Sequence, residues 1–218
     1  MKLQIFSLLF LSLISIQAQV YSYETEQNGK LITHRITMDD SYLVETQYVA
    51  TPAEFILTRG GFYTKTAKVI SVDFEFNSNF DKDGLKQMEL EWSEDWILLS
   101  KEPKDLNGKW LMAGRMTEQG ERRRDTSGPR KTMKFLLDGF FQWIAYNTET
   151  FQFFGSGGGY YTTEGGKYTE HIEYFSRDNS RVGAVLPFNY ELKGTDWHHQ
   201  GFSSKGDPMH EIWTNREL

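Results

Sequence analysis

The sequence contains no cysteine, so the fold has no disulfide and the protein has no thiol nucleophile. It also lacks a Gly-x-Ser-x-Gly nucleophile motif, and no stretch of ten residues has the apolar period of a helix. Positive charge is in the minority, because the formal net charge is −6. A nucleic-acid partner, whose phosphates require a basic face, is therefore not expected.

Apolar runs are short everywhere except at the N-terminus. There, Lys2 is followed by an apolar stretch from Ile5 to Ile16 and by Ala18 before Gln19. This pattern predicts a secretory signal peptide over residues 1–18 and favours it over a buried helix, which would show a polar face. We expect an exported protein, periplasmic or secreted, that is not inserted in the membrane. Without a cysteine at the cleavage point, a lipid anchor is not expected.

Aromatic residues are abundant, with sixteen Phe, eleven Tyr and six Trp. Buried rings of this size supply a core that needs no disulfide. The apolar period is two rather than 3.6, and every second residue from Ile70 to Phe76 is apolar. Turn signals such as Asp138-Gly139 recur between these stretches. An all-β fold of antiparallel strands is predicted, and closure into a barrel is favoured because it removes exposed edges.

The sequence also repeats itself. Residues 38–78 align without a gap on residues 136–176 at a constant shift of 98 positions, and the identical positions include Tyr48 with Tyr146 and Glu75 with Glu173. Such self-similarity indicates two units of related architecture. The charged residues 101–105 mark the boundary, so residues 19–104 are expected to form a β-rich N-terminal unit and residues 105–218 a second one.

The second unit has enough strands for a barrel. Its eight predicted strands are Lys109–Met116, Thr132–Leu137, Phe140–Tyr146, Phe151–Thr163, Lys167–Ser176, Arg181–Leu192, Asp196–Phe202 and Met209–Arg216. Eight strands enclose a space for side chains or one small ligand. The first unit is expected to be a shortened sibling barrel, or a set of strands that extends or covers the second unit.

Two tryptophan motifs frame this second unit. Gly108-Lys109-Trp110 opens its first strand, and Glu211-Ile212-Trp213 precedes Arg216 at its end. With Gly159-Tyr160-Tyr161-Thr162 between them, these motifs resemble those of the lipocalin-like, or calycin, barrels. Within that group they are similar to uncharacterised proteins exported by Gram-negative bacteria. The resemblance implies an antiparallel up-and-down barrel and structural roles for Trp110, Trp213 and Arg216, with Arg216 stacked on the Trp110 indole at the barrel base.

A candidate ligand pocket follows from comparing the two copies. Apolar positions of the first copy, among them Ile70, Val72 and Val44, are replaced by polar residues in the second. Such replacements are expected where a packed interior has become a polar-lined pocket. The predicted ligand-binding residues are Gln142, Tyr146, Tyr168, Glu170 and Tyr174. An inward-facing Glu170 requires a partner, for which a tyrosine hydroxyl or a buried Arg is the simplest candidate.

Residues that could carry catalysis are few. Glu170 alone, or His171 with Glu173 as an acid/base pair, are the candidates, although a surface contact is the favoured role of the latter pair. His198 and His199, with His210 and Asp207, would suit zinc or copper. Adjacent strand residues face opposite ways, however, so His198 and His199 cannot bind one ion and no metal site is expected. No cofactor is expected either.

Two further segments have structural interpretations. The basic run Arg122-Arg123-Arg124, with Arg130 and Lys131 nearby, is interpreted as a solvated loop in preference to an anion site. The glycine-rich residues 155–159 precede a β pattern rather than a helix, so they predict a bulge or bend rather than a phosphate cradle.

The functional hypothesis is therefore a carrier. It would hold a small apolar, aromatic-stacking or glycan-type ligand in the second barrel. The alternatives are an enzyme acting on such a ligand through Glu170 or the His171 and Glu173 pair, and an adhesion protein. The surface composition is compatible with a protein partner, and the sequence does not fix an oligomeric state.

Overall fold

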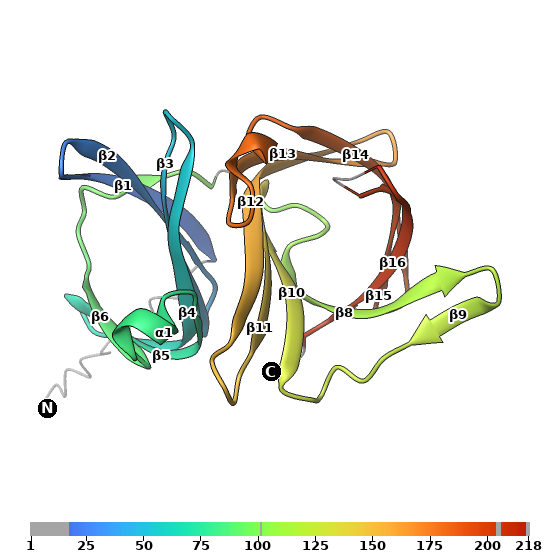
Figure 1. The fold of residues 1–218 in the computed structure, drawn as a ribbon, viewed down its shortest axis with the longest axis horizontal. Coiled ribbons are helices and arrows are strands. Elements are labelled where there is room, and N and C mark those ends of the chain that lie inside the picture. Colours follow the sequence, from blue (N-terminus) through green and yellow to red (C-terminus); the bar gives the residue numbers. More distant parts are fainter. Residues whose placement is uncertain (1–17, 101, 204–205, 217–218) are drawn as a thin grey trace, which may run out of the picture.

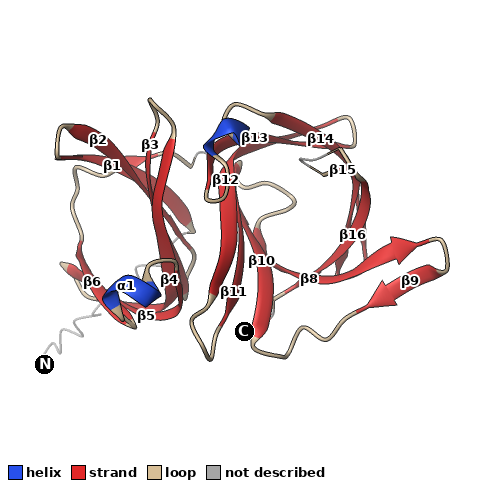
Figure 2. Cartoon of the chain, viewed as in Figure 1, coloured by secondary structure: helices blue, strands red, loops and turns tan. Residues whose placement is uncertain are grey.

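The computed structural model describes residues 18–100, 102–203 and 206–216. The predicted all-β fold is confirmed: an antiparallel half-barrel of seven strands precedes an antiparallel closed barrel of eight (Figure 1). The only helices in these ranges are the single turns α1 (Phe80–Asp83) and η1 (Asn179–Arg181) (Figure 2). None of the described helices has the length and hydropathy to cross a membrane. The signal peptide expected over residues 1–18 lies, apart from Ala18, outside the described residues.

The first unit is a single sheet in the order β6-β5-β4-β3-β2-β1-β7. Its strands are β1 (Gln19–Gln27), β2 (Lys30–Met38), β3 (Tyr42–Val49), β4 (Glu54–Lys65), β5 (Val69–Asn77), β6 (Gln87–Glu91) and β7 (Ile97–Leu98). Alternation places Leu43, Ile70 and Val72 on its concave face, where they form a core with Met38 and Trp96. Since β6 and β7 stand at opposite ends of the order, the sheet stays open.

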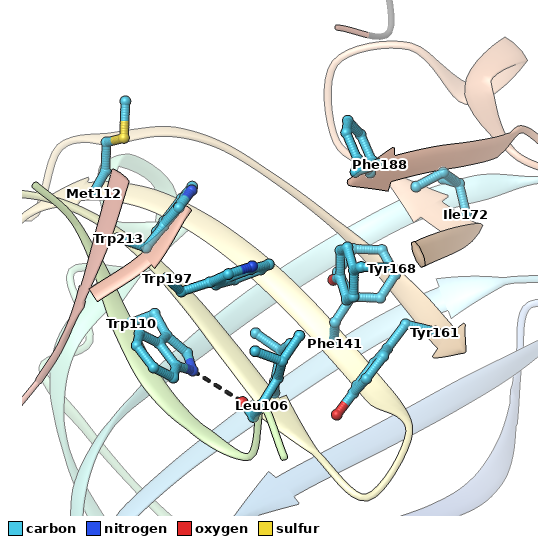
Figure 3. Close-up of a cluster of buried hydrophobic side chains, with 11 residues drawn as sticks. Leu106, Trp110, Met112, Phe141, Tyr161, Tyr168, Ile172, Phe188, Trp197 and Trp213 are labelled. Carbon is cyan, nitrogen blue, oxygen red and sulfur yellow. Dashed lines mark hydrogen bonds between the residues drawn. The ribbon is translucent and has the colours of Figure 1, made fainter. Parts of the chain in front are cut away.

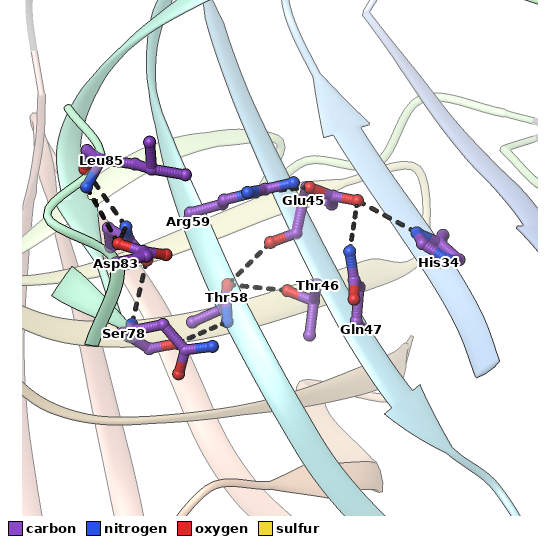
Figure 4. Close-up of polar contacts among 11 residues, drawn as sticks. His34, Glu45, Thr46, Gln47, Thr58, Arg59, Ser78, Asp83 and Leu85 are labelled. Atoms are coloured by element: carbon purple, nitrogen blue, oxygen red, sulfur yellow. Dashed lines mark hydrogen bonds and ion pairs between the residues drawn. The ribbon is translucent and has the colours of Figure 1, made fainter. Parts of the chain in front are cut away.

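A buried carboxylate network lies within this half-barrel (Figure 4). Glu45 accepts hydrogen bonds from Arg59 Nε (2.7 Å) and Gln47 Nε2 (2.9 Å), and its carboxylate lies 3.0 Å from His34 Nδ1. Burial acts to raise the pKa of Glu45, but these partners outweigh it and the pKa is lowered. The carboxylate is thus satisfied by its neighbours, as a buried charge must be.

The second unit is a closed barrel. Its strands are β8 (Gly108–Thr117), β9 (Gly120–Arg123), β10 (Arg130–Leu137), β11 (Phe140–Asn147), β12 (Phe153–Glu164), β13 (Lys167–Phe175), β14 (Val185–Lys193), β15 (Asp196–Phe202) and β16 (Pro208–Asn215). Consecutive strands from β10 to β16 pair in order, and β8 pairs with both β16 and β10 to close the ring. β9 pairs only with β8 and forms a hairpin that extends beyond the barrel (Figure 1).

Two details differ from the sequence prediction. Arg122 and Arg123 belong to strand β9 rather than to a loop, because residues 114–117 continue β8 far enough to pair with residues 120–123. Arg181 lies in η1, and β14 begins only at Val185, because the Asp178 side chain accepts a hydrogen bond from the Ser180 backbone and stabilises a local turn.

The same β-bulge occurs in both units. On β13, Ile172 pairs with Gly159 and Tyr174 with Gly158, so Glu173 is the extra residue. A Cβ on Gly159 would overlap the carbonyl oxygen of His171, which is why the bulge requires glycine there. Glu75 is the extra residue at the matching place on β5. A bulge reverses the side-chain alternation, so residues before and after Glu173 on β13 do not share one face as a regular strand would predict.

The two units pack against each other through the convex face of the half-barrel. β3 and β5 supply apolar side chains that meet those of β8, β10 and β11: Tyr42, Val44 and Phe76 on one side, and Leu111, Met133, Phe135, Ile144 and Tyr146 on the other. One wall of the barrel is therefore buried on both faces, one facing the lumen and one facing the half-barrel.

Ion pairs also cross this interface. Arg216 donates to both carboxylate oxygens of Glu75, at 2.8 and 2.7 Å. In the opposite sense, Arg35 of the first unit donates to Glu173 of the second. The bulged glutamate of each unit is thus bound by an arginine of the other.

Candidate functional site

One end of the second barrel is closed by aromatic side chains (Figure 3). Trp110 is buried and donates from Nε1 to the Leu106 carbonyl (2.9 Å), while Trp197 and Tyr168 pack beside it. Trp197 meets the rings of Trp110 and Trp213 at centroid distances of 5.8 and 6.0 Å. This end of the lumen is a packed core.

The other end opens into a cavity of about 810 Å³. The volume lies within the range of sites that enclose small molecules. Apolar side chains form much of its wall: Met112, Trp143, Ile172, Phe175, Leu186, Phe188, Met209 and Trp213.

An ion pair lies at the inner part of this cavity. Lys134 Nζ donates to Glu170 Oε1 (2.6 Å), and both residues are 5 % exposed. The Tyr168 hydroxyl donates to the same oxygen (3.0 Å). Burial, followed by the Glu170 charge, raises the pKa of Tyr168 well above its usual value. Lys134 also faces the rings of Trp197 and Trp213, at 5.1 and 5.2 Å.

His199 is the other buried polar group of the cavity wall. Neither of its ring nitrogens has a hydrogen-bond partner within the described structure, and Nδ1 lies 3.6 Å from Glu211 Oε2. Burial and the Lys134 charge lower the pKa of His199 to about 4, against the opposing effects of Glu211 and Glu170. The imidazole is therefore neutral near pH 7, with one ring nitrogen as a donor and the other as an acceptor.

Arginines surround the open end. The cavity wall includes Arg115, Arg122, Arg123, Arg124, Arg130 and Arg177, whereas Glu170 and Glu211 are its only carboxylates among the described residues. The first four come from the β8–β9 hairpin and the residue that follows it. The mouth of the cavity is therefore strongly cationic.

Only part of the predicted pocket lies in the lumen. Glu170 lines the cavity and Tyr168 packs at its closed end. Gln142, Tyr146 and Tyr174 do not line it; they are buried at the interface with the half-barrel.

The reason is the direction in which β11 faces. Gln142 donates to Thr58 (2.9 Å) and Ser156 (2.9 Å) and accepts from Thr46 (3.0 Å), while Trp143 on the opposite face lines the cavity. Tyr146 lies on the same outer face as Gln142.

Tyr174 is turned outward by the bulge at Glu173. Its ring lies 5.0 Å from that of Tyr48 in the first unit, and the next residue, Phe175, lines the cavity.

The other chemical candidates are separated from the lumen. His171 stacks on Tyr160 (centroids 4.3 Å apart), and Glu173 is bound by Arg35. Both line a smaller hollow of about 400 Å³ outside the barrel, together with Tyr48 of the first unit. Neither is brought next to Glu170.

The histidines of β15 face opposite ways, as predicted. His198 lies 3.1 Å from His210, between Nδ1 and Nε2, whereas His199 lines the cavity. Over the described ranges, no group of three or more His, Cys, Asp or Glu side chains could hold a metal ion.

Arg216 does not stack on Trp110. Its backbone N–H donates to the Lys109 carbonyl (2.7 Å), so it lies beside Lys109, whose side chain leaves the barrel to bind Asp39. Trp110 points the other way, into the lumen. Arg216 instead binds Glu75, with its guanidinium 5.3 Å from the ring centre of Tyr42.

Sequence reasoning did not place Lys134 or His199 in the pocket, and it considered His199 only as a metal ligand. Lys134 does carry a signal, since it is a lone charge in the buried stretch 133–137. No sequence signal identifies Glu170 as its partner, because the two residues lie on strands that barrel closure brings together.

The model of one protein family, described as "Domain of unknown function (DUF4488)", matches residues 105–217. This match covers just over half of the 218 residues and coincides with the barrel, so the chain belongs to the DUF4488 family. No curated protein is significantly similar to the chain.

Proposed function

We propose that the chain is an exported, lipocalin-like binding protein that holds one small ligand in the barrel of its second unit. The observation that carries the proposal is the cavity of about 810 Å³, which is open at one end and walled by apolar and aromatic side chains. The opposite end is filled by Trp110, Trp197 and their neighbours, so a ligand would enter and leave through the arginine-lined mouth.

The side chains of the cavity favour binding over turnover. Glu170, the acid expected from the sequence, is held by Lys134 and Tyr168. A carboxylate paired in this way is poorly placed to exchange protons with a ligand.

The test is a thermal and urea unfolding screen of the purified protein with decanoate, haem and maltotriose as probes. A bound probe at one hundred times its Kd raises the unfolding free energy by about 2.7 kcal/mol. Leu186→Trp adds bulk to the cavity wall and should abolish the shift, whereas Leu192→Trp, at an exposed position of the same strand, should preserve it.

A probe that stabilises wild type and Leu186→Trp equally would contradict binding in this cavity. Export is tested separately: the mature protein should begin at Gln19, as N-terminal sequencing would show.

A further inference from the structure

The arginines at the cavity mouth have more charge than their neighbours neutralise. Arg115 lies 3.6 Å from Glu211, and Arg123 pairs with Asp196 at 2.6 Å. Within the part of the chain that the structure describes, no carboxylate lies within 4.0 Å of the remaining four: Arg122, Arg124, Arg130 and Arg177.

The fold itself brings these cations together. Arg115 and Arg122 are directly paired across the β8–β9 hairpin, and the Arg124 backbone N–H donates to the Ala113 carbonyl (2.9 Å). Partial burial, together with the charges of Arg130 and Arg115, lowers the pKa of Arg124. Like charges held this close are mutually destabilising, and a bound anion would relieve the repulsion.

Deeper in the cavity the charge is balanced. Glu170 neutralises Lys134, and the surrounding wall is apolar from Met112 to Trp213. His199 lines this space and is 1 % exposed, and its Nδ1 lies 3.6 Å from Glu211 Oε2. A polar mouth above an apolar, nearly neutral lumen matches a molecule with one acidic end and an apolar body.

We infer that the ligand is an amphiphilic organic anion, with its carboxylate or similar acidic group held by Arg124 and Arg130 and its apolar body in the lumen. This inference rests on the proposed binding function. The planar guanidinium group binds carboxylates through two parallel hydrogen bonds, and its charge does not titrate near neutral pH.

The experiment compares three probes with the same ten-carbon chain: decanoate, 1-decanol and decyltrimethylammonium. Titration calorimetry and tryptophan fluorescence with the wild-type protein give each Kd, and acetate serves as the acidic group alone. Decanoate is expected to bind at least about tenfold more tightly than the other two probes. Increasing salt should weaken the binding of decanoate only. Acetate should bind far more weakly than decanoate, because it has no apolar body to bury.

The double variant Arg124→Gln/Arg130→Gln should bind decanoate at least about tenfold more weakly than wild type and should bind 1-decanol with unchanged Kd. Arg181→Gln, outside the cavity wall, is the control and should change neither Kd. Equal affinities for all three probes, each blocked by Leu186→Trp, would overturn the anionic ligand and leave the proposed function standing. Failure of every probe to bind would overturn both.

Discussion

His199 should make the stability of this protein depend on pH between 6.5 and 4. Its imidazole lies 4.0 Å from the Phe188 ring and 5.1 Å from Trp197, and it also faces Lys134, Glu170 and Glu211. Burial and Lys134 lower the pKa of His199 from 6.5 to about 4. The unfolded chain therefore takes up a proton at a higher pH than the native protein does.

The sign and size follow from linkage. The stabilisation that comes from a neutral His199 is complete above pH 6.5 and is lost as the pH falls toward 4. One pKa unit corresponds to roughly 1.4 kcal/mol, so the loss attributable to this residue is about 2 kcal/mol at pH 5. Urea unfolding of wild type and His199→Phe at pH 7.5 and pH 5 measures it: the variant should lose about 2 kcal/mol less than wild type.

Proton NMR gives an independent check, since the His199 ring signals should remain those of a neutral imidazole down to pH 5. A His199 signal that titrates near pH 6.5, or equal pH dependence of the two proteins, would refute the reasoning. His210, whose pKa is also lowered, contributes equally to both proteins and cancels in the comparison.

Two further predictions concern the bulges and the interface. Burial alone would raise the pKa of Glu75, but hydrogen bonds from Arg216 and two tyrosines lower it below 4.5. Glu75→Gln should therefore lower the free energy of unfolding by about 2–3 kcal/mol at pH 7. In urea unfolding, the difference in stability between this variant and wild type should narrow below pH 4.5. A gap that is constant from pH 7 to 3 would exclude a stabilising charge there. Gly159→Ala should destabilise the protein by about 1–3 kcal/mol or more in the same assay, because the added Cβ overlaps the His171 carbonyl oxygen. Gly128→Ala, whose Cβ would meet open space, should be neutral. Equal stability of these two alanine variants would argue against the bulge geometry.

The sequence predicted the strands well because alternation and turns are local properties. It identified which residues share a face but not which face points inward. β11 is buried on both faces, with Trp143 in the lumen and Gln142 against the half-barrel, so a polar replacement at Gln142 had two physical explanations. The prediction that Tyr174 lines the pocket failed for a different reason. A one-residue bulge at Glu173 reverses the side-chain alternation, and the apolar pattern of the sequence does not reveal it.

The interface explains why certain repeat positions are identical. Three ring contacts cross the interface, with distances given between ring centres: Tyr48 with Tyr174 at 5.0 Å, Phe76 with Tyr146 at 4.9 Å, and Phe55 with Phe153 at 6.4 Å. In the repeat, Tyr48 is equivalent to Tyr146, Phe76 to Tyr174, and Phe55 to Phe153. A shift of 98 residues exchanges the first two contacts and maps the third onto itself. This reciprocity is the property of an isologous, two-fold interface. The two units therefore meet as the subunits of a symmetric dimer would.

A symmetric interface requires similar residues in both copies, whereas the two interiors face no such requirement. Tyr48, Phe55 and Glu75 lie at the interface and are unchanged in the second copy, while the interior positions Val72 and Glu45 become Glu170 and Trp143. The half-barrel satisfies Glu45 through its own neighbours, whereas in the second barrel neither nitrogen of His199, a residue that lines the open cavity, has a hydrogen-bond partner within the described residues. Divergence between the copies thus includes the lumen of the second unit, and it also reaches the interface, where Val44 becomes Gln142. The proposed binding role would account for the changes at the lumen positions, while the ring contacts between the two units keep their two-fold pattern.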